Sequence, residues 1–203
     1  MDLDDLIAHP KIWKASSAHQ RLECVPTGFA ALDRFLPGAG WPRRAIMEIF
    51  VDRYGIGELG LLMPALARLE QRSIAWIAPP YIPYAPALAR CGIDLNGMLV
   101  VHPVTENDAP WAIEEIVRGQ FQATVLAWLR VTNDRTLRRL QLIVEAQQAW
   151  AILFRPVSMA QQKSPAVLKL RLSKQGERLK IEILKCRGSR PKVVFLTDRG
   201  GVG

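Results

Sequence analysis

Cysteine and histidine are scarce in this sequence, and neither residue type clusters. The 203 residues include three cysteines and three histidines, at Cys24, Cys91, Cys186, His9, His19 and His102. Such scattered positions exclude a disulfide framework and the short Cys/His spacings that are typical of a zinc site. We therefore expect a protein of a reducing compartment, without a bound metal.

Long apolar runs and a basic N-terminus are also missing. No apolar stretch of the sequence approaches the roughly 20 residues that cross a bilayer. The first ten residues, MDLDDLIAHP, are acidic and lack the basic-then-apolar order of a secretory signal. Hydrophobic residues nevertheless make up 49% of the chain, which is enough for a packed core. These features predict a cytoplasmic protein with one folded domain and short extensions.

Acidic residues are few near the C-terminus. Residues 1–162 hold 16 basic and 16 acidic residues, whereas residues 163–203 hold 11 basic and 3 acidic ones, so the whole net charge of +8 lies in the second segment. Such a block attracts a phosphate backbone or an acidic protein surface. Solvent-facing charges on ordinary strands would give the same pattern. Nucleic-acid binding by this block would be weak and salt-sensitive. The candidate contacts for nucleic acid or an acidic partner are Lys185, Arg187, Arg190 and Lys192.

Apolar segments of two periods alternate along the chain. Short apolar runs predict buried strands at residues 45–51, 73–79, 97–103, 123–129 and 149–157. Amphipathic stretches predict helices at residues 28–36, 57–71, 85–92, 109–120 and 134–148. A hairpin is expected at 167–187 and a last strand at 192–198. This alternation predicts an α/β fold of three layers, α/β/α, with a mostly parallel sheet and antiparallel strands at the C-terminal end.

The segment VPTGFAALDRFLPGAGWPRRAIMEIF, residues 25–50, resembles the entry to the ATPase core of RecA-like proteins. In that family, a [ST]-G-x-x-x-L-D helix leads through a Gly-rich turn and a proline to the strand before the phosphate loop. The matching positions are held by Thr27, Gly28, Leu32, Asp33, Gly38, Gly40, Pro42 and Glu48. The resemblance implies a RecA-like domain at residues 22–198, preceded by an N-terminal arm at 1–21 and followed by a tail at 199–203.

The phosphate loop of that family is degenerate here. The motif G-x-x-x-x-G-K-[ST] offers backbone N–H groups and a lysine to phosphates, and a hydroxyl to Mg²⁺. Its glycine, glycine, lysine and hydroxyl positions are held by Asp52, Gly57, Glu58 and Leu59. A carboxylate at the lysine position repels phosphate. We therefore interpret Glu58 as a structural residue at a helix N-terminus.

Two further groups of a RecA-type ATPase are missing from the sequence. The strand that ends in a water-positioning Glu in that family ends here in Ala78-Pro79-Pro80. Trp128 stands where the family carries a metal-supporting Asp. Together with the lost lysine, these changes predict that the chain is not an enzyme and has no nucleotide cofactor.

A set of specific segments runs through nearly the whole chain. HPKIW, VPTGFAALD, GIGELGLLMPALARL, APPYIPYAPAL, VLAWL and LFRP follow one another in this order. The combination is similar to the ImuA family of translesion-synthesis-associated proteins, which belongs with the cell-division inhibitor SulA in a RecA-related group. The resemblance implies a non-catalytic accessory role in SOS-induced translesion DNA synthesis. The partners it implies are an ImuB-like protein and the error-prone DNA polymerase complex, with RecA as a further candidate.

Three other functions stay open on the residues. The main alternative is a SulA-like inhibitor that binds the division protein FtsZ. A working RecA-type ATPase is disfavoured by Glu58, Leu59 and Trp128. A RecA-fold DNA-binding protein of another pathway would use the basic C-terminal segment.

Two apolar segments are candidate partner-binding sites. In the arm, Ile12 and Trp13 would either dock on a partner or fold back onto the chain's own core. Tyr81 and Tyr84 belong to the rigid loop PPYIPY, at the edge where α/β sheets bind ligands. This loop would either receive a partner or fill the vacated nucleotide site. Core positions are expected for Trp111, Trp128 and Trp150.

Overall fold

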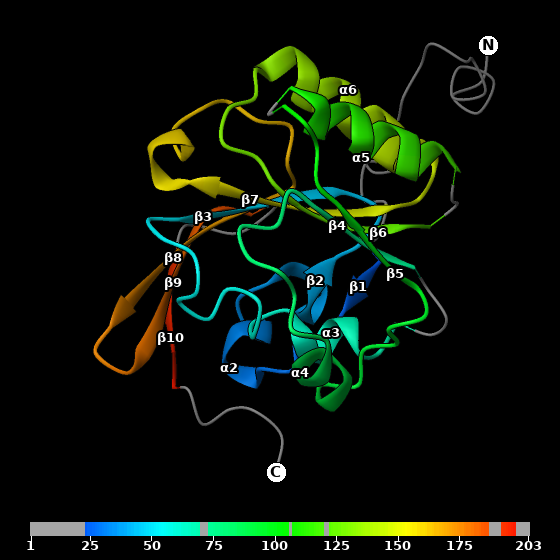
Figure 1. Cartoon of the computed structure of the whole chain (residues 1–203). Coiled ribbons are helices and arrows are strands. Elements are labelled where there is room, and N and C mark those ends of the chain that lie inside the picture. The colour runs from blue at the N-terminus through cyan, green and yellow to red at the C-terminus, as the bar shows by residue number, and fades with distance from the viewer. Residues whose placement is uncertain (1–22, 70–72, 106, 120–121, 187–191, 198–203) are drawn as a thin grey trace, which may run out of the picture.

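A single large sheet forms the centre of the molecule (Figure 1). The computed structural model describes residues 23–69, 73–105, 107–119, 122–186 and 192–197. Within these residues the sheet has eight strands, in the order β10-β9-β8-β3-β7-β6-β4-β5. Their bounds are β3 Ile46–Val51, β4 Ile74–Ile77, β5 Met98–Val101, β6 Thr124–Trp128, β7 Trp150–Pro156, β8 Leu168–Gln175, β9 Arg178–Cys186 and β10 Lys192–Thr197.

The strands from β8 to β5 in this order all run parallel. Strands β9 and β10 extend the sheet beyond β8 through antiparallel pairings. The predicted fold class, an α/β protein with a mostly parallel sheet and antiparallel C-terminal strands, is confirmed. It agrees with a RecA-like core.

Helices and short strands cover the two faces of the sheet (Figure 1). On one face lie α5 (Asp108–Gly119) and α6 (Asp134–Ala146). The opposite face carries α2 Ala30–Asp33, α3 Met63–Leu66, α4 Ala85–Arg90 and the two-stranded sheet of β1 Cys24–Val25 and β2 Trp41–Pro42. Two short 3-10 helices, η2 Pro37–Ala39 and η3 Val157–Met159, lie in the connections. No helix of the described residues has both the length and the apolarity that a bilayer crossing requires.

Side-chain alternation along the strands separates the core into two layers. In β3, Ile46 packs in the cluster under α5 and α6, whereas Met47 and Ile49 pack in the cluster toward α2, α3 and α4. All six residues of β3 are buried, as expected for a central parallel strand that is covered on both faces. Gln141 of α6 accepts a hydrogen bond from the Ile46 backbone N–H at 3.2 Å and so fixes this helix against β3.

The helices nearest the degenerate motif are shorter than predicted. The helix expected at 57–71 forms only as α3, Met63–Leu66, after a series of turns. Pro64 lies in the first turn of α3 because a proline has no N–H to donate further back and is tolerated only at a helix start. Residues 70–72 of that prediction lie outside the described residues.

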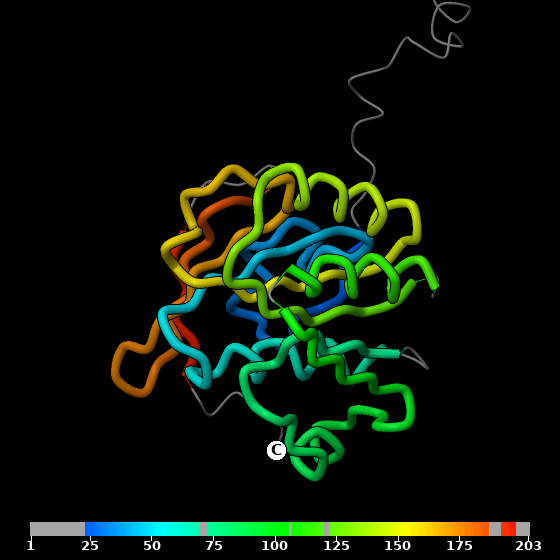
Figure 2. Tube along the Cα trace, turned by 45° about the horizontal axis from the view of Figure 1, so that its top comes forward, coloured from blue at the N-terminus to red at the C-terminus, as the bar shows by residue number. Residues whose placement is uncertain are grey.

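Seen from a second direction, the β8–β9 hairpin projects beyond the body of the molecule (Figure 2).

Candidate functional site

The loop after β3 binds its own carboxylate. Glu58 accepts hydrogen bonds from the backbone N–H of Gly55 at 2.8 Å and of Ile56 at 2.9 Å. The residue is only 3% exposed. Backbone N–H groups in such a loop form a concave site for an anion. Two of the donors that a phosphate loop offers to a nucleotide are therefore already bound to a side chain of this chain.

The surrounding residues show how the sequence permits this arrangement. Gly57 has a φ of 109°, which lets the chain turn back so that Glu58 faces the preceding N–H groups. Leu59 packs against the hydrophobic core, and Asp52 is exposed. The prediction that Glu58 begins a helix is wrong, because α3 starts at Met63. The carboxylate stabilises the loop itself.

An aromatic stack lies at the carboxyl ends of the neighbouring strands. The ring of Trp128 stacks on Phe154 with centroids 4.7 Å apart and on Trp76 with centroids 5.6 Å apart. Trp128 and Trp150 are buried, as predicted, but Trp111 is 62% exposed, so its expected core position is wrong. Trp128 therefore occupies the position where the RecA resemblance expects a carboxylate, and its indole has no oxygen to offer a metal.

A cavity of about 430 Å³ opens beside this stack. Its lining includes Tyr54, Pro80, Tyr81, Val104, Trp128 and Arg130. The Nε1–H of Trp128 is buried and has no hydrogen-bond partner among the described residues. Tyr81 and Tyr84 are 69% and 67% exposed, so these two side chains do not fill the vacated site. Together with Ile82 and Val104, which are also exposed, they form what we name the carboxyl-edge patch.

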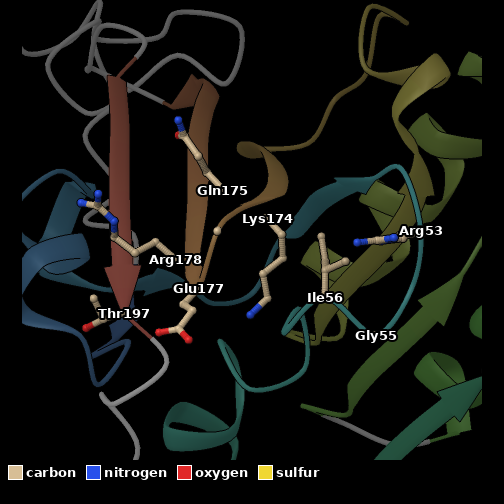
Figure 3. A pocket seen from close by; sticks show the side chains of 9 residues that line it. Arg53, Gly55, Ile56, Lys174, Gln175, Glu177, Arg178 and Thr197 are labelled. Carbon is tan, nitrogen blue, oxygen red and sulfur yellow. The ribbon is translucent and has the colours of Figure 1, made fainter.

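A second and larger hollow, of about 1100 Å³, separates the degenerate loop from the β8–β9 hairpin. Figure 3 shows Lys174 reaching from the hairpin into the space beside the loop that carries Arg53 and Ile56. Arg178 and Glu177 also line this hollow. With Arg53, Lys174 and Arg178 against Glu177, the lining carries a net positive charge, although the loop's own N–H groups at Gly55 and Ile56 already hold a carboxylate.

A fully buried ion pair links β3 to β7. Arg155 Nη1 donates to Glu48 Oε1 at 2.6 Å, and both side chains are 0% exposed. Arg155 Nη2 also donates to Gln162 Oε1 at 2.7 Å, and Gln162 Nε2 donates to the Thr132 carbonyl at 2.8 Å. Sequence reasoning did not predict this pair. The available signal was a charged residue inside each of two otherwise apolar strands, AIMEIFV and AILFRPV.

Lys169 of β8 extends this polar network to the segment that follows η3. Its Nζ donates to the carbonyls of Ala160 at 2.7 Å and Gln162 at 2.9 Å, and it lies 5.1 Å from the centroid of the Phe50 ring. Burial lowers the pKa of Lys169, while the nearby Glu48 carboxylate acts in the opposite direction. The lysine holds the 160–162 segment against the sheet.

Of the four basic residues predicted to contact nucleic acid or an acidic partner, the structure describes two, and these lie on opposite faces of the sheet. Lys185 donates to the Ser164 carbonyl at 2.9 Å, on the sheet face that also carries Lys169. Lys192 lies on the opposite face, where its Nζ is 4.7 Å from the centroid of the Phe35 ring. Arg187 and Arg190 lie outside the described residues, as do Ile12 and Trp13 of the arm. The predicted boundaries of the N-terminal arm, after residue 21, and of the tail, after residue 198, also lie outside the described residues.

The sequence is similar to two kinds of characterised protein. RecA of Chlorobaculum parvum is 30% identical over 105 residues, which make up 51% of this chain and 30% of that protein. RecA of Chloroflexus aurantiacus is 31% identical over 121 residues, 58% of this chain and 34% of that protein. The cell division inhibitor SulA of Edwardsiella piscicida is 26% identical over 114 residues, 53% of this chain and 68% of that protein.

These similarities are partial. The chain spans about a third of the length of the RecA proteins it matches and about two thirds of that of SulA. No protein-family profile matches it. Over about half of its length, the chain is related in sequence to RecA and SulA proteins, which supports a RecA/SulA-like family.

Proposed function

We propose that this chain is a non-catalytic accessory protein of the DNA-damage response that acts in translesion DNA synthesis by binding an ImuB-like protein. The observation that carries the non-catalytic part is the Glu58 carboxylate in the loop after β3. The similarity to RecA and SulA proteins supports the DNA-damage context. The resemblance to the ImuA family supports the ImuB-like partner, the error-prone polymerase complex and RecA as a further partner. A place in the cytoplasm is proposed from the composition of the sequence.

Nucleotide binding at this loop would require several unfavourable steps. A phosphate would have to displace the Glu58 carboxylate from its two backbone donors. Both hydrogen bonds to this carboxylate are charge-assisted and would be lost. It would then lie next to a displaced carboxylate of the same charge sign. Leu59 offers no hydroxyl to a metal, and Trp128 offers only an indole. These properties support a function that does not involve binding or hydrolysis of a nucleotide at this loop.

Protein contacts are supported by the carboxyl-edge patch. Its members Tyr81, Ile82, Tyr84 and Val104 are 67–96% exposed. Exposed aromatic side chains beside a cavity are typical of protein-binding surfaces because they bury much area at little entropic cost. Trp128 lines that cavity, and its indole offers an aromatic surface against which an inserted segment would pack. We propose this patch as the partner surface.

The test is a binding titration of the purified chain against the ImuB-like protein of the same host, with FtsZ measured in parallel. Replacement of both tyrosines, Tyr81→Ala with Tyr84→Ala, is expected to weaken ImuB binding by at least about tenfold. Leu142→Ala is the matched control, because Leu142 is 68% exposed on α6, away from the patch. Equal affinities of the two variants would contradict the proposed surface.

One observation favours the SulA-like alternative, an inhibitor that binds FtsZ. The SulA match covers 68% of that protein, more than the share of either RecA protein. Binding to FtsZ alone in the parallel titration would replace the translesion proposal with this one. Binding to neither protein would contradict both.

A further inference from the structure

The sheet face formed by the outward side of β8, β9 and β10 is not covered by a helix of the described residues. Helix α5 packs on β4 and β6, and α6 packs on β3. Figure 1 shows both helices at the other end of the sheet, away from the β8–β9 hairpin and β10. On the reverse side of these three strands, Leu170, Ile181 and Val194 are buried in the core. One side of the extension is therefore core. The other faces solvent except at Lys169 and Lys185, which bond to carbonyls of the 160–164 segment.

Cations dominate the solvent-facing side. Residues that pair across the strands point to the same side of a sheet, so Arg171 lies beside Glu182, and Lys180 lies beside Phe195. Lys169 on this side is buried, and the cations that solvent reaches are Arg171, Arg178, Lys180 and Lys185. Glu182 pairs with Lys180 and, at 3.7 Å, with Arg171. One carboxylate cannot neutralise four cations, so the side keeps a net positive charge. We name these four cations with Val193 and Phe195 the basic sheet face.

Strand β10 departs from the usual residue pattern of a sheet that has one solvent-exposed face. Such a sheet places apolar side chains inward and polar side chains outward. In β10 the inward Val194 and Leu196 are apolar, but so are the outward Val193 and Phe195, which are 48% and 43% exposed. The guanidinium of Arg178 lies 5.6 Å from the centroid of the Phe195 ring. An exposed aromatic ring is thus placed among cations.

Basic residues continue beyond both ends of this face. At one end, a cavity of about 440 Å³ is lined by Lys163, Lys169 and Lys185. At the other end is the hollow beside the hairpin, with Arg53 and Lys174 (Figure 3). The nine residues of β9 span about 30 Å at 3.4 Å per residue. This length is enough for a short stretch of extended polymer rather than one small anion.

We propose that the basic sheet face binds single-stranded nucleic acid. A positively charged strip that tracks the phosphates, combined with an aromatic ring on which a base can stack, is how proteins bind single strands without sequence preference. An acidic peptide would use the cations but would have no use for Phe195. A duplex would present its phosphates but keep its bases stacked inside. The proposal does not depend on which protein partner the chain has.

The test is fluorescence anisotropy of the full chain with a labelled oligothymidylate of about 15 nucleotides, which is within the site sizes of single-strand binders. Four phosphate contacts give a slope of log affinity against log salt of about −2.8, a loss of about 50-fold between 50 and 200 mM salt. An oligouridylate of the same length distinguishes DNA from RNA as the source of the strand. A duplex of the same length and a polyglutamate peptide are the competing ligands.

Two variants and one control locate the site. Arg178→Ala with Lys180→Ala is expected to reduce the salt slope to about −1.4, because two phosphate contacts are lost. Phe195→Leu is expected to weaken oligothymidylate binding about fivefold or more, through lost stacking, without changing the salt slope. Arg68→Ala with Arg90→Ala removes the same charge from exposed residues on the opposite side of the sheet, near α3 and α4, and is expected to change little.

Each outcome decides the proposal. Binding of oligothymidylate, of oligouridylate or of both, with the expected loss in the two variants, supports it. The proposal is overturned if the single strands do not bind at 50 mM salt, or if the control pair loses as much affinity as the Arg178 and Lys180 pair. Tighter binding of polyglutamate, unaffected by Phe195→Leu, would assign the face to an acidic protein instead. Circular dichroism of each variant separates lost binding from lost folding.

Discussion

At the scale of single residues, Glu58 combines burial, charge and backbone hydrogen bonding. We expect Glu58→Gln to lower the free energy of unfolding by about 1–3 kcal/mol, because the neutral amide loses charge-assisted bonds and turns an N–H₂ group toward backbone donors. The measurement is urea unfolding followed by tryptophan fluorescence. Asp52→Asn, at an exposed position of the same loop, is the control and should stay within about 0.5 kcal/mol of wild type. Equal effects of the two changes would mean that the carboxylate does not stabilise the loop.

Individual residues also show what local sequence can and cannot predict. The bonds from Glu58 reach residues only two and three positions away, so a loop with this arrangement was open to prediction. A helix start was predicted instead because a carboxylate after Gly57 is equally suited to one. The exposed position of Trp111 was not predicted, because α5 is amphipathic and composition alone does not say which aromatic faces solvent.

At the scale of secondary-structure elements, the Glu48–Arg155 pair joins β3 and β7 inside the core. Removing one partner leaves the other charge buried and unpaired, so Arg155→Met alone should cost about 3–5 kcal/mol of unfolding free energy. The double change, Glu48→Met with Arg155→Met, should recover much of that loss. The measurement is a double-mutant cycle in urea. Two losses that simply add would contradict coupling between the strands.

Elements differ in how far the sequence predicts them. The buried strands and the two long helices, α5 and α6, were predicted within a few residues, because both have strong periodicity and long apolar segments. The helix at 57–71 was predicted too long, because the carboxylate of Glu58 and the position of Pro64 favour turns before Met63. Contacts such as Glu48–Arg155, which are 107 positions apart, follow from strand order and have no local signal.

At the scale of the whole molecule, the degenerate loop predicts how the protein responds to nucleotide. A ligand that binds only the folded state at 100 times its Kd stabilises that state by about 2.7 kcal/mol. We expect no such stabilisation with MgATP, so the Tm should shift by less than about 1 °C across a concentration series. Differential scanning fluorimetry measures the shift, with an active RecA as the positive control. A saturable rise in Tm would contradict the proposal that the site takes no nucleotide.

The arrangement of the whole sheet also explains why two of the candidate basic residues lie apart. The sequence indicated a basic C-terminal block, but strand alternation divides it, so that Lys185 and Lys192 face opposite sides. Arg171, Arg178 and Lys180 lie on one side with Phe195 only because β8, β9 and β10 are paired in one register. The bulge between Lys169 and Leu170 shifts the pairing by one residue of β9 and so brings Lys185 to this same side.

The anion held by the loop after β3 is part of the chain, and this sets how the protein can be controlled. In proteins that cycle with a nucleotide, the phosphate arrives, is cleaved and leaves, and the surrounding surface alternates between two shapes in step with it. A carboxylate joined to the backbone by its own side chain cannot be exchanged or consumed. Under the proposal that this loop takes no nucleotide, the adjoining surface would not alternate with nucleotide hydrolysis. Its availability to the proposed partner would then follow the amount of the protein present.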